Sequence, residues 1–347
     1  MTLKERIETF SELGQILRDY LDGKSTAYSC GLEKLVKEQQ FHNPWFTPDN
    51  MRLAIGSIGD TLTYNNLLKW TGNYPELTSV EKSGNVGVIM AGNIPLVGFH
   101  DFISVLITGN RIISKVSSKD SESIVFIGDI LSRINSSFAG NINFTTDFLK
   151  GFEIVIATGG DNSSRYFEYY FRNYPRIIRK NRNSIAVLDG TETPEELEAL
   201  GKDVFSYFGL GCRNVSKVYL PEGYDPEDLA ANWETFSSLI NHNKYANNYD
   251  FNKAVSLVNN EKFADTGYLI LKENIRLSSP VAMLHYEFYD SQDKINKSIG
   301  SLEEKIQCIV GRNHISFGTS QQPQLWDYSD GVDTVEFLLK KNTVRIL

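Results

Sequence analysis

Three residues of this sequence stand in surroundings that could support chemistry: a cysteine, an asparagine and a lysine. Cys212 lies in the stretch GLGCRNVSKVYLP, between a glycine and an arginine and just ahead of a short apolar run. A thiolate in a locally positive setting is a strong nucleophile that can accept an acyl group. Because a single cysteine is more often a small, inert core residue, the residue type alone leaves both interpretations open.

Asn93 and Lys115 each follow or end a short apolar run, in AGNIPL and in ISKVSSK, where Ser117 stands two residues further on. A third run ends in the glycines of ATGGD, Gly159 and Gly160. If the runs are parallel strands, their carboxyl ends meet at one edge of the sheet, where such sheets bind ligands, and glycines let a ligand approach the backbone closely. The structural alternatives are a capped turn for the asparagine and a solvated surface side chain for the lysine.

The elements that would position these residues alternate between helix and strand. Residues 3–20 carry apolar side chains at helical spacing, and Thr47 is expected to cap a helix with Pro48 at its first position, so the first 80 residues are expected to be mostly helical. After them, short apolar runs such as VGVIMA, RIISKV and FEIVIATGG alternate with helical segments. This alternation predicts βαβ units and a largely parallel sheet, hence an α/β fold, and we place the boundary between two lobes near residue 205.

Common cofactor and metal motifs are absent. The patterns G-x-G-x-x-G, G-x-x-x-x-G-K-[ST], H-E-x-x-H and G-x-S-x-G do not occur. The five histidines are scattered without metal-ligand spacing, so no metal is expected. The three cysteines fit neither a zinc pattern nor a disulfide framework, which favours the reducing cytoplasm.

Charge and hydropathy narrow the classes of partner. The net charge of −8 argues against broad nucleic-acid binding. The basic stretch RIIRKNR, from Arg176 to Arg182, is a candidate site for an anionic ligand or, more simply, a solvated strand edge or loop. No run approaches the roughly 18 apolar residues of a membrane span, and the start MTLKERIETF does not read as a secretory signal.

The order of the pieces NIPL, GNRIISKVSS, ATGG and GLGCRNVSKVYLP resembles the aldehyde dehydrogenase superfamily. More closely, the chain resembles the bacterial fatty acyl-CoA reductases of the luminescence (LuxC-like) family, to which the C-terminal stretch HISFGTSQQPQLWDYSDGVDTVEFLL is also similar. The resemblance covers roughly residues 84 to 340, and the N-terminal 80 residues match only loosely.

This resemblance implies an aldehyde-dehydrogenase-like α/β fold, with a Rossmann-type cofactor domain and an α/β catalytic domain. Four regions are then expected along the chain. They are a mostly helical N-terminal part of the cofactor lobe (1–83), a Rossmann-like NADP-binding domain (84–205), a catalytic domain with the nucleophilic cysteine (206–325), and a C-terminal helix and strand tail (326–347).

The resemblance also implies roles for single residues. Cys212 matches the nucleophile, and Asn93 matches the asparagine whose amide forms the oxyanion hole with the Cys212 backbone N–H. Lys115 matches the lysine that contacts the adenosine ribose or its 2′-phosphate, with Ser117 nearby as a further cofactor-binding residue. Gly159 and Gly160 fall where the diphosphate of the cofactor, expected to be NADPH, is approached.

Two departures from the aldehyde dehydrogenase pattern bear on the reaction. Arg179 stands where a glutamate serves as general base for hydrolysis, and Arg276 stands where a second glutamate holds the nicotinamide ribose. An enzyme without these acidic groups fits a reaction in which the acyl-cysteine is reduced or transferred to a thiol instead of being hydrolysed by water.

The function implied is NADPH-dependent reduction of a fatty acyl-CoA or acyl-protein thioester to an aldehyde through an S-acyl cysteine. The alternatives are a cysteine-dependent acyltransferase or thioesterase without hydride transfer, and a non-catalytic scaffold in an acyl-transfer complex. The family implies an acyl-donating synthetase as a partner and a homo-oligomer, a dimer or tetramer.

Overall fold

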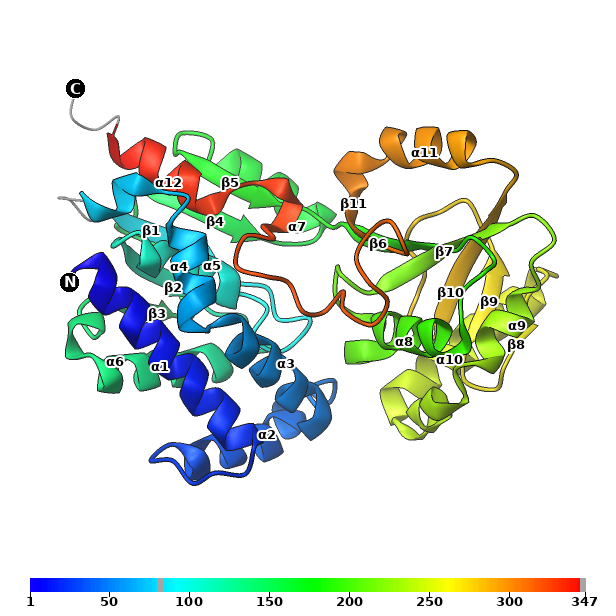
Figure 1. Cartoon of the computed structure of the whole chain (residues 1–347), viewed down its shortest axis with the longest axis horizontal. Helices are drawn as coiled ribbons and strands as arrows, with labels where there is room; N and C mark the ends of the chain where they lie inside the picture. The colour runs from blue at the N-terminus through cyan, green and yellow to red at the C-terminus, as the bar shows by residue number, and fades with distance from the viewer. Residues whose placement is uncertain (80–83, 344–347) are drawn as a thin grey trace. The chain divides into compact units, whose positions relative to one another are not determined.

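The computed structural model describes residues 1–79 and 84–343 (Figure 1). The chain divides into two compact units, the first formed by Met1–Asn181 with Pro323–Leu347 and the second by Arg182–Gln322. The predicted boundary near residue 205 therefore falls inside the second unit. The reason is strand pairing: β6 (Asn183–Val187) pairs with β7 (Val215–Pro221) of the second unit, so the residues around it belong there.

The first part of the chain, up to residue 71, is mostly helical, as predicted for the first 80 residues. The helix expected over residues 3–20 is α1, and its N-cap Thr2 forms a capping box with Glu5. Thr47 is the N-cap of α3, where its hydroxyl accepts the Asn50 N–H. The four helices are α1 (Leu3–Leu21), α2 (Ser29–His42), α3 (Pro48–Thr61) and α4 (Tyr64–Thr71).

A five-stranded parallel sheet follows, in the order β3-β2-β1-β4-β5 (Figure 1). Its central strands are buried apolar runs, as expected for a sheet covered on both faces. The basic stretch that starts at Arg176 forms β5, an edge strand. The strands are β1 (Asn85–Ile89), β2 (Arg111–Lys115), β3 (Ile142–Thr145), β4 (Ile154–Thr158) and β5 (Arg176–Arg179).

In the first unit, helices α5, α6 and α7 lie between the strands along the chain, and α12 is the C-terminal helix. The predicted helix that ends near Gly109 is α5, and Gly109 has a φ of 78° just beyond it. The C-terminal helix α12 packs against α5, and residues 344–347, where the predicted terminal strand would fall, lie outside the described residues. The helices are α5 (Phe99–Ile107), α6 (Ser123–Ile134), α7 (Asp161–Tyr170) and α12 (Thr334–Thr343).

The second unit is built on a six-stranded sheet in the order β11-β6-β7-β10-β9-β8 (Figure 1). Its pairs are parallel except for β8 with β9, which is antiparallel. The remaining strands are β8 (Ala264–Asp265), β9 (Ile270–Glu273), β10 (Met283–Tyr289) and β11 (Ile306–Val310). The helices are α8 (Pro194–Phe205), α9 (Pro226–Ala231), α10 (Asn243–Val258) and α11 (Gln292–Ser301).

Both faces of this second sheet are covered by core. On one face Trp233 and Phe205 meet edge to face with ring centroids 5.5 Å apart, and on the other Tyr219 packs with Ile295 of α11. A strand buried on both sides needs apolar residues on both of its faces, as residues 218–220 of β7 provide. Short 3₁₀ turns join the elements of the two units: η1 (Pro75–Thr78), η2 (Ser136–Phe138), η3 (Ser206–Gly209), η4 (Glu234–Asn241), η5 (Glu303–Lys305) and η6 (Ser329–Gly331).

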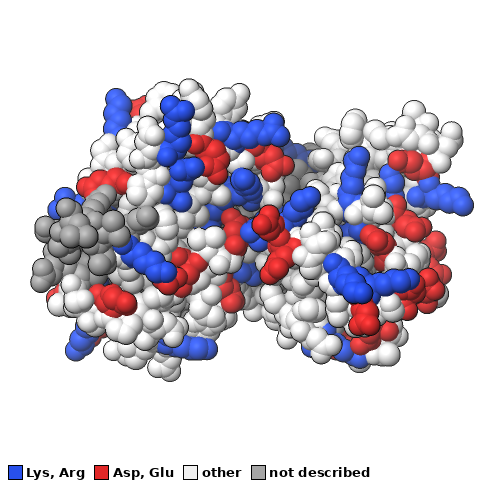
Figure 2. Space-filling view, turned by 90° about the horizontal axis from the view of Figure 1, so that it is seen from above, with Lys and Arg blue, Asp and Glu red and all other residues white. Residues whose placement is uncertain are grey.

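One face of the molecule is mixed in charge. On the face drawn in Figure 2, basic and acidic side chains interleave, so this face presents no broad field of one sign. Among residues 1–79 and 84–343, no helix combines the length and apolar character needed to cross a bilayer. The same residues contain no group of three or more histidine, cysteine or acidic side chains arranged to hold a metal ion.

Candidate active site

The residues predicted at strand ends in the first unit lie at one edge of its sheet. Ile89, the last residue of β1, is level with Lys115 of β2 and with Ala157 of β4. Asn93 and Ser117 follow β1 and β2, and Gly159 and Gly160 follow β4, so the structure brings all five predicted residues of this unit to the same carboxyl edge. Asn93 is exposed there.

The turn that carries Asn93 is held by the loop after β2. A Cβ at Gly92 would collide with the Ser117 side chain, so only glycine allows the two loops to approach this closely. The Leu96 N–H donates to the Asp120 carboxylate at 2.9 Å, and burial raises the pKa of Asp120. The asparagine turn and the segment after Lys115 therefore form one packed unit.

Lys115 reaches across the same edge to the loop after β3. Its Nζ donates to the Asp147 carbonyl at 3.2 Å and lies 5.2 Å from the ring centre of Phe148. The side chain is only partly exposed. The Lys115 ammonium group is thus held at the carboxyl edge of the sheet, where it could bind an anionic or hydroxyl group of a ligand.

The two glycines after β4, Gly159 and Gly160, differ in how much room their surroundings leave for a side chain. A Cβ at Gly159 would lie 2.8 Å from Phe167 and from Ser163, so packing alone requires glycine there. Gly160, the N-cap of α7, has a φ of −66°, and a Cβ there would meet Asn181 Nδ2 only at 3.6 Å. Packing leaves room for a side chain at Gly160, which would cover the first N–H groups of the helix. Open access to these groups suits a phosphate, although Asp161 stands exposed in the same turn.

Arg179, for which the resemblance implies the position of a missing glutamate, makes structural contacts within the first unit. The guanidinium is 4% exposed and binds both carboxylate oxygens of Asp101 in α5, at 3.2 and 2.7 Å. It also donates to the Ser329 carbonyl at 2.7 Å and to the Thr334 hydroxyl at 2.8 Å. The arginine therefore ties the end of β5 to α5 and to the C-terminal segment.

Arg276, for which the resemblance implies the position of the second missing glutamate, is exposed in the loop between β9 and β10 of the second unit. Its backbone N–H donates to Asn274 Oδ1 at 3.0 Å, and its carbonyl accepts from Nδ1 of the buried His285 at 3.1 Å. The backbone is thus anchored while the side chain faces solvent.

Cys212 lies in the second unit, in the loop that leads into β7. Its thiol is exposed and forms no disulfide, as for Cys30 in the first unit, whereas Cys308 in β11 is buried and also forms no disulfide. Exposure removes the interpretation of Cys212 as an inert core residue. Arg213, next to it, donates to the Ser320 carbonyl at 3.5 Å, so its cation is tethered beside the thiol-bearing loop.

The backbone just ahead of this loop is strained. Tyr207, Phe208 and Gly209 have successive φ values of 52°, 58° and 75°, the left-handed region. This region costs a non-glycine residue about 1–2 kcal/mol. Both aromatic rings are buried, and the Phe208 ring packs on His242 with centroids 4.4 Å apart, so burial holds the strained turn in place. Strain of this kind concentrates at functional sites.

Two buried polar residues that sequence reasoning missed anchor the loop itself. The Asn214 side chain accepts the Gly211 N–H at 2.8 Å and donates to the Ser206 carbonyl at 2.8 Å. The Ser184 hydroxyl donates to the Cys212 carbonyl at 2.9 Å. The asparagine is visible in the sequence two positions after the cysteine, but nothing in the sequence identifies its partners.

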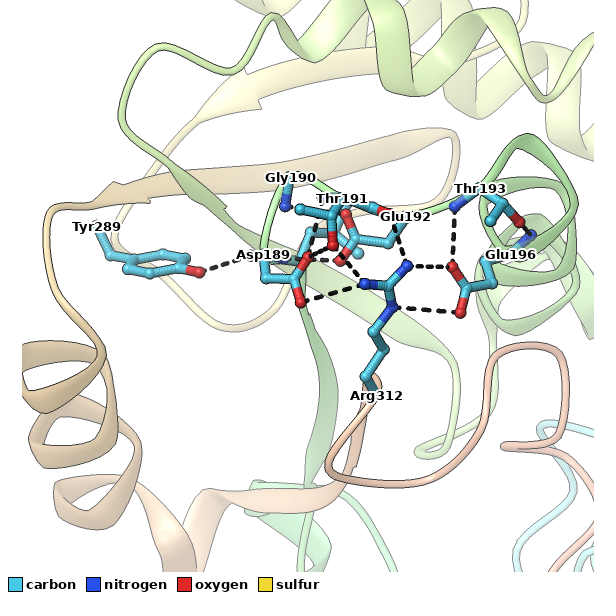
Figure 3. Close-up of polar contacts among 9 residues, drawn as sticks. Asp189, Gly190, Thr191, Glu192, Thr193, Glu196, Tyr289 and Arg312 are labelled. Atoms are coloured by element: carbon cyan, nitrogen blue, oxygen red, sulfur yellow. Dashed lines mark hydrogen bonds and ion pairs between the residues drawn. The ribbon is translucent and has the colours of Figure 1, made fainter.

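A second set of contacts holds the segment after β11 near α8. Both oxygens of Asp203, in α8, accept backbone N–H groups, from Gly318 at 2.6 Å and from Ser320 at 2.9 Å, and burial raises the pKa of this carboxyl. Figure 3 shows Arg312 between the loop after β6 and the start of α8, where it binds the Thr191 carbonyl at 2.6 Å and Glu196 at 2.8 Å. The segment after β11, in which the Ser320 carbonyl accepts the hydrogen bond from Arg213, is therefore held at Arg312 and at Gly318 and Ser320.

No protein-family model matches this sequence, and no curated protein sequence matches it significantly. Solved structures do match. Aldehyde dehydrogenase 21 from Physcomitrella patens, in complex with the reaction product succinate, aligns with 98% of this chain and 84% of its own, at a TM-score of 0.69 and 12% identity. NAD+ complexes of aldehyde dehydrogenases from Bacillus cereus and Mycobacterium tuberculosis align with 89% and 85% of this chain and 72% and 70% of theirs, each at a TM-score of 0.60 and 12% identity.

The chain therefore has the fold of the aldehyde dehydrogenases, which confirms the predicted fold class. At these identities the likeness establishes the fold and leaves the chemistry to be argued from the site.

Proposed function

We propose that this protein reduces an acyl thioester, an acyl-CoA or acyl-protein, to an aldehyde through an S-acyl Cys212 intermediate. The observation that carries the proposal is an exposed cysteine, outside any disulfide, in an anchored loop that follows a strained turn of an aldehyde dehydrogenase fold. NADPH is the cofactor we propose, and fatty acyl groups are the substrate class suggested by the resemblance to LuxC-like reductases.

In the first step the Cys212 thiolate attacks the thioester carbonyl carbon. A new sulfur–carbon bond forms and the carbonyl oxygen becomes an oxyanion. The Asn93 amide and the Cys212 backbone N–H are the proposed donors to it, and losing one such donor typically costs about 100- to 1,000-fold in rate. When the oxyanion collapses, the bond to the CoA sulfur breaks, CoA leaves as its thiolate, and the acyl group remains on Cys212.

The residues at the carboxyl edge of the first unit fit a nicotinamide dinucleotide. Gly160 leaves the N-terminus of α7 open to a diphosphate, and Lys115 offers a cation to the ribose or its 2′-phosphate. When bound, the reduced cofactor supplies the two electrons that convert the Cys212 thioester into an aldehyde. Two of the structural neighbours are themselves NAD+ complexes.

Reduction is favoured over hydrolysis by the state of Arg179. A hydrolytic enzyme needs a base to activate water, and the position of that base in aldehyde dehydrogenases is taken here by an arginine bound to Asp101. A thioester on Cys212 would therefore be protected from water for lack of a base at this position.

A cysteine-dependent acyltransferase is the second candidate. The exposed carboxylate of Asp161 stands in the first turn of α7, where it opposes an anionic diphosphate, and Arg276 replaces the glutamate expected at the nicotinamide ribose. A protein that accepts an acyl group but binds no dinucleotide would carry these two features.

The deciding experiment is intact-mass measurement after incubation with a long-chain acyl-CoA, followed by addition of NADPH. We expect a gain of one acyl group that is absent in Cys212→Ala, persists in Cys30→Ala, and is lost on adding NADPH with release of aldehyde. Cys30 is the matched control because it is the other exposed cysteine of the described chain. A gain that persists with NADPH supports the transferase, and no gain with any acyl length contradicts the nucleophile assignment and favours the scaffold.

A further inference from the structure

We infer that Asn214 is a positioning residue that sets the direction of the Cys212 backbone N–H for acyl transfer. The inference rests on the proposed function, in which this N–H stabilises the oxyanion. Its basis is the set of contacts made by the side chain and the backbone of one buried residue.

The side-chain amide of Asn214 joins the end of α8 to the residue before the nucleophile. Its Oδ1 accepts the Gly211 N–H at 2.8 Å. Its Nδ2 donates to the Ser206 carbonyl at 2.8 Å and to the Asp203 carbonyl at 3.1 Å, and it lies 3.4 Å from the Val204 carbonyl. Asn214 is only 2% exposed, so water does not compete for these bonds.

The backbone of Asn214 orients the peptide that contains the Cys212 N–H. The Asn214 N–H donates to the Gly211 carbonyl at 3.1 Å. In a trans peptide the carbonyl and the following N–H point in opposite directions, so a fixed Gly211 carbonyl directs the Cys212 N–H away from Asn214. On the far side of the cysteine, Ser184 holds the Cys212 carbonyl at 2.9 Å. The peptide planes before and after Cys212 are therefore both held.

Only an amide can make both kinds of side-chain contact that Asn214 makes. An asparagine supplies an acceptor to Gly211 and donors to the carbonyls of α8, whereas an aspartate of the same size accepts but cannot donate. Asn214→Asp keeps the bond to Gly211 and sets a negative charge against the carbonyls of Asp203 and Ser206. The variant therefore loosens the loop from α8 without removing a heavy-atom position.

The consequence is specific to acyl transfer. A hydrogen bond weakens steeply as its angle departs from linear, so a peptide free to rotate stabilises the oxyanion poorly. Alkylation of the same thiol by iodoacetamide forms no oxyanion. Loosening the loop should therefore slow acylation much more than alkylation, a difference that a general loss of stability would not produce.

The test compares wild-type protein, Asn214→Asp and a matched control, Asn252→Asp. Asn252 is also buried, and its Nδ2 donates to the carbonyl of Val281 at 2.8 Å, which is not part of the loop that carries Cys212. For each protein the rate of Cys212 acylation by a long-chain acyl-CoA and the rate of its alkylation by iodoacetamide are measured by intact mass, and the melting temperature is recorded.

We expect the ratio of acylation to alkylation rates to fall about 10- to 100-fold in Asn214→Asp and to stay within about twofold of wild type in Asn252→Asp. An unchanged ratio in a folded Asn214→Asp overturns the inference. If wild-type Cys212 is alkylated but never acylated, the proposed function fails instead, and this outcome is separate because it appears without any variant.

A measurement on the unaltered protein covers the case in which Asn214→Asp does not fold. The Gly211 amide should exchange with solvent deuterium at least about 10-fold more slowly than in an unstructured peptide, because Asn214 holds it. Exchange at the unprotected rate overturns the inference.

Discussion

Arg179 and Asp101 form a two-point ion pair in the interior of the first unit, with Nε–Oδ2 and Nη2–Oδ1 distances of 3.2 and 2.7 Å. Both residues are less than a tenth exposed. The resemblance to aldehyde dehydrogenases implies a general base at the position of Arg179, whereas the contacts of this pair give the arginine a structural role.

Breaking this pair should destabilise the first unit strongly. Asp101→Asn removes the two-point partner of a buried guanidinium and leaves Asp330, at 4.0 Å, as a more distant counter-charge, so we expect a loss of up to about 3–5 kcal/mol in the free energy of unfolding, measured by urea denaturation. In the double variant Asp101→Asn with Arg179→Met the buried charge is gone, so part of the loss should be recovered. Equal stability of the single variant and wild type would contradict a structural role for the pair.

The Ser184 hydroxyl should contribute to the rate at which Cys212 is acylated. Ser184→Ala removes the donor to the Cys212 carbonyl, and a bond of this kind contributes about 0.5–1.5 kcal/mol, so acylation should slow by roughly 2- to 10-fold. Ser216→Ala is the control, because its hydroxyl donates to the Leu277 carbonyl at 2.8 Å and to the Ser184 carbonyl at 3.4 Å but not to the Cys212 carbonyl. Rapid quenching with intact-mass detection measures both, and equal effects would argue against a role of Ser184 in holding the cysteine.

Gly209 should tolerate alanine poorly. Its φ is 75°, and a Cβ would lie 3.4 Å from the Val204 carbonyl oxygen, so Gly209→Ala should cost about 1–2 kcal/mol of unfolding free energy. Gly300 in α11 is the counterpart: a Cβ there meets nothing within 4 Å, and Gly300→Ala should stabilise by about 0.5–1 kcal/mol. Chemical denaturation compares the two, and a neutral Gly209→Ala would show that the turn is not strained.

His285 should make stability fall as the solution becomes acidic. Burial lowers the pKa of His285, assisted by the charges of Lys272 and Lys217, so the folded state binds a proton less readily than the unfolded state. Its contribution is complete above the ordinary value of 6.5 and is lost as the pH falls toward the lowered pKa, with a limiting slope of about 1.4 kcal/mol per pH unit. Between about pH 7.5 and 5.5, wild type should lose more unfolding free energy than His285→Gln, and parallel curves would refute this.

Gly160 should matter for cofactor binding more than for folding. Gly160→Ala sets a methyl group over the N-terminus of α7, where the chain has room for it, so dinucleotide binding should weaken about 10-fold or more while stability changes by about 1 kcal/mol or less. Fluorescence titration with NADPH and thermal melting measure the two effects. Gly140→Ala, at a position with nothing within 4 Å, should leave binding unchanged, and equal NADPH affinity in Gly160→Ala and wild type would remove Gly160 from the site.

Much of the fold was predictable because its signals are local. A strand buried on both faces needs mostly apolar residues, so β1 and β4 are visible in the sequence, whereas β2 alternates between buried and more exposed residues. Thr47 and Pro48 predict the start of α3 correctly, because helix capping involves only residues of the neighbouring turn. The lobe boundary was not predictable in this way, since β6 joins the second sheet through partners far along the chain.

The sequence by itself determined the α/β class, the residues that follow each strand, and Cys212 as the candidate nucleophile, since these depend on short runs and their order. Only the tertiary structure decided that Arg179 pairs with Asp101, 78 positions away, and that Asn214 and Ser184 hold the cysteine loop. The physical reason is that the residue type fixes which hydrogen bonds a polar side chain can donate or accept. Its actual partner depends on which groups the folded chain buries beside it.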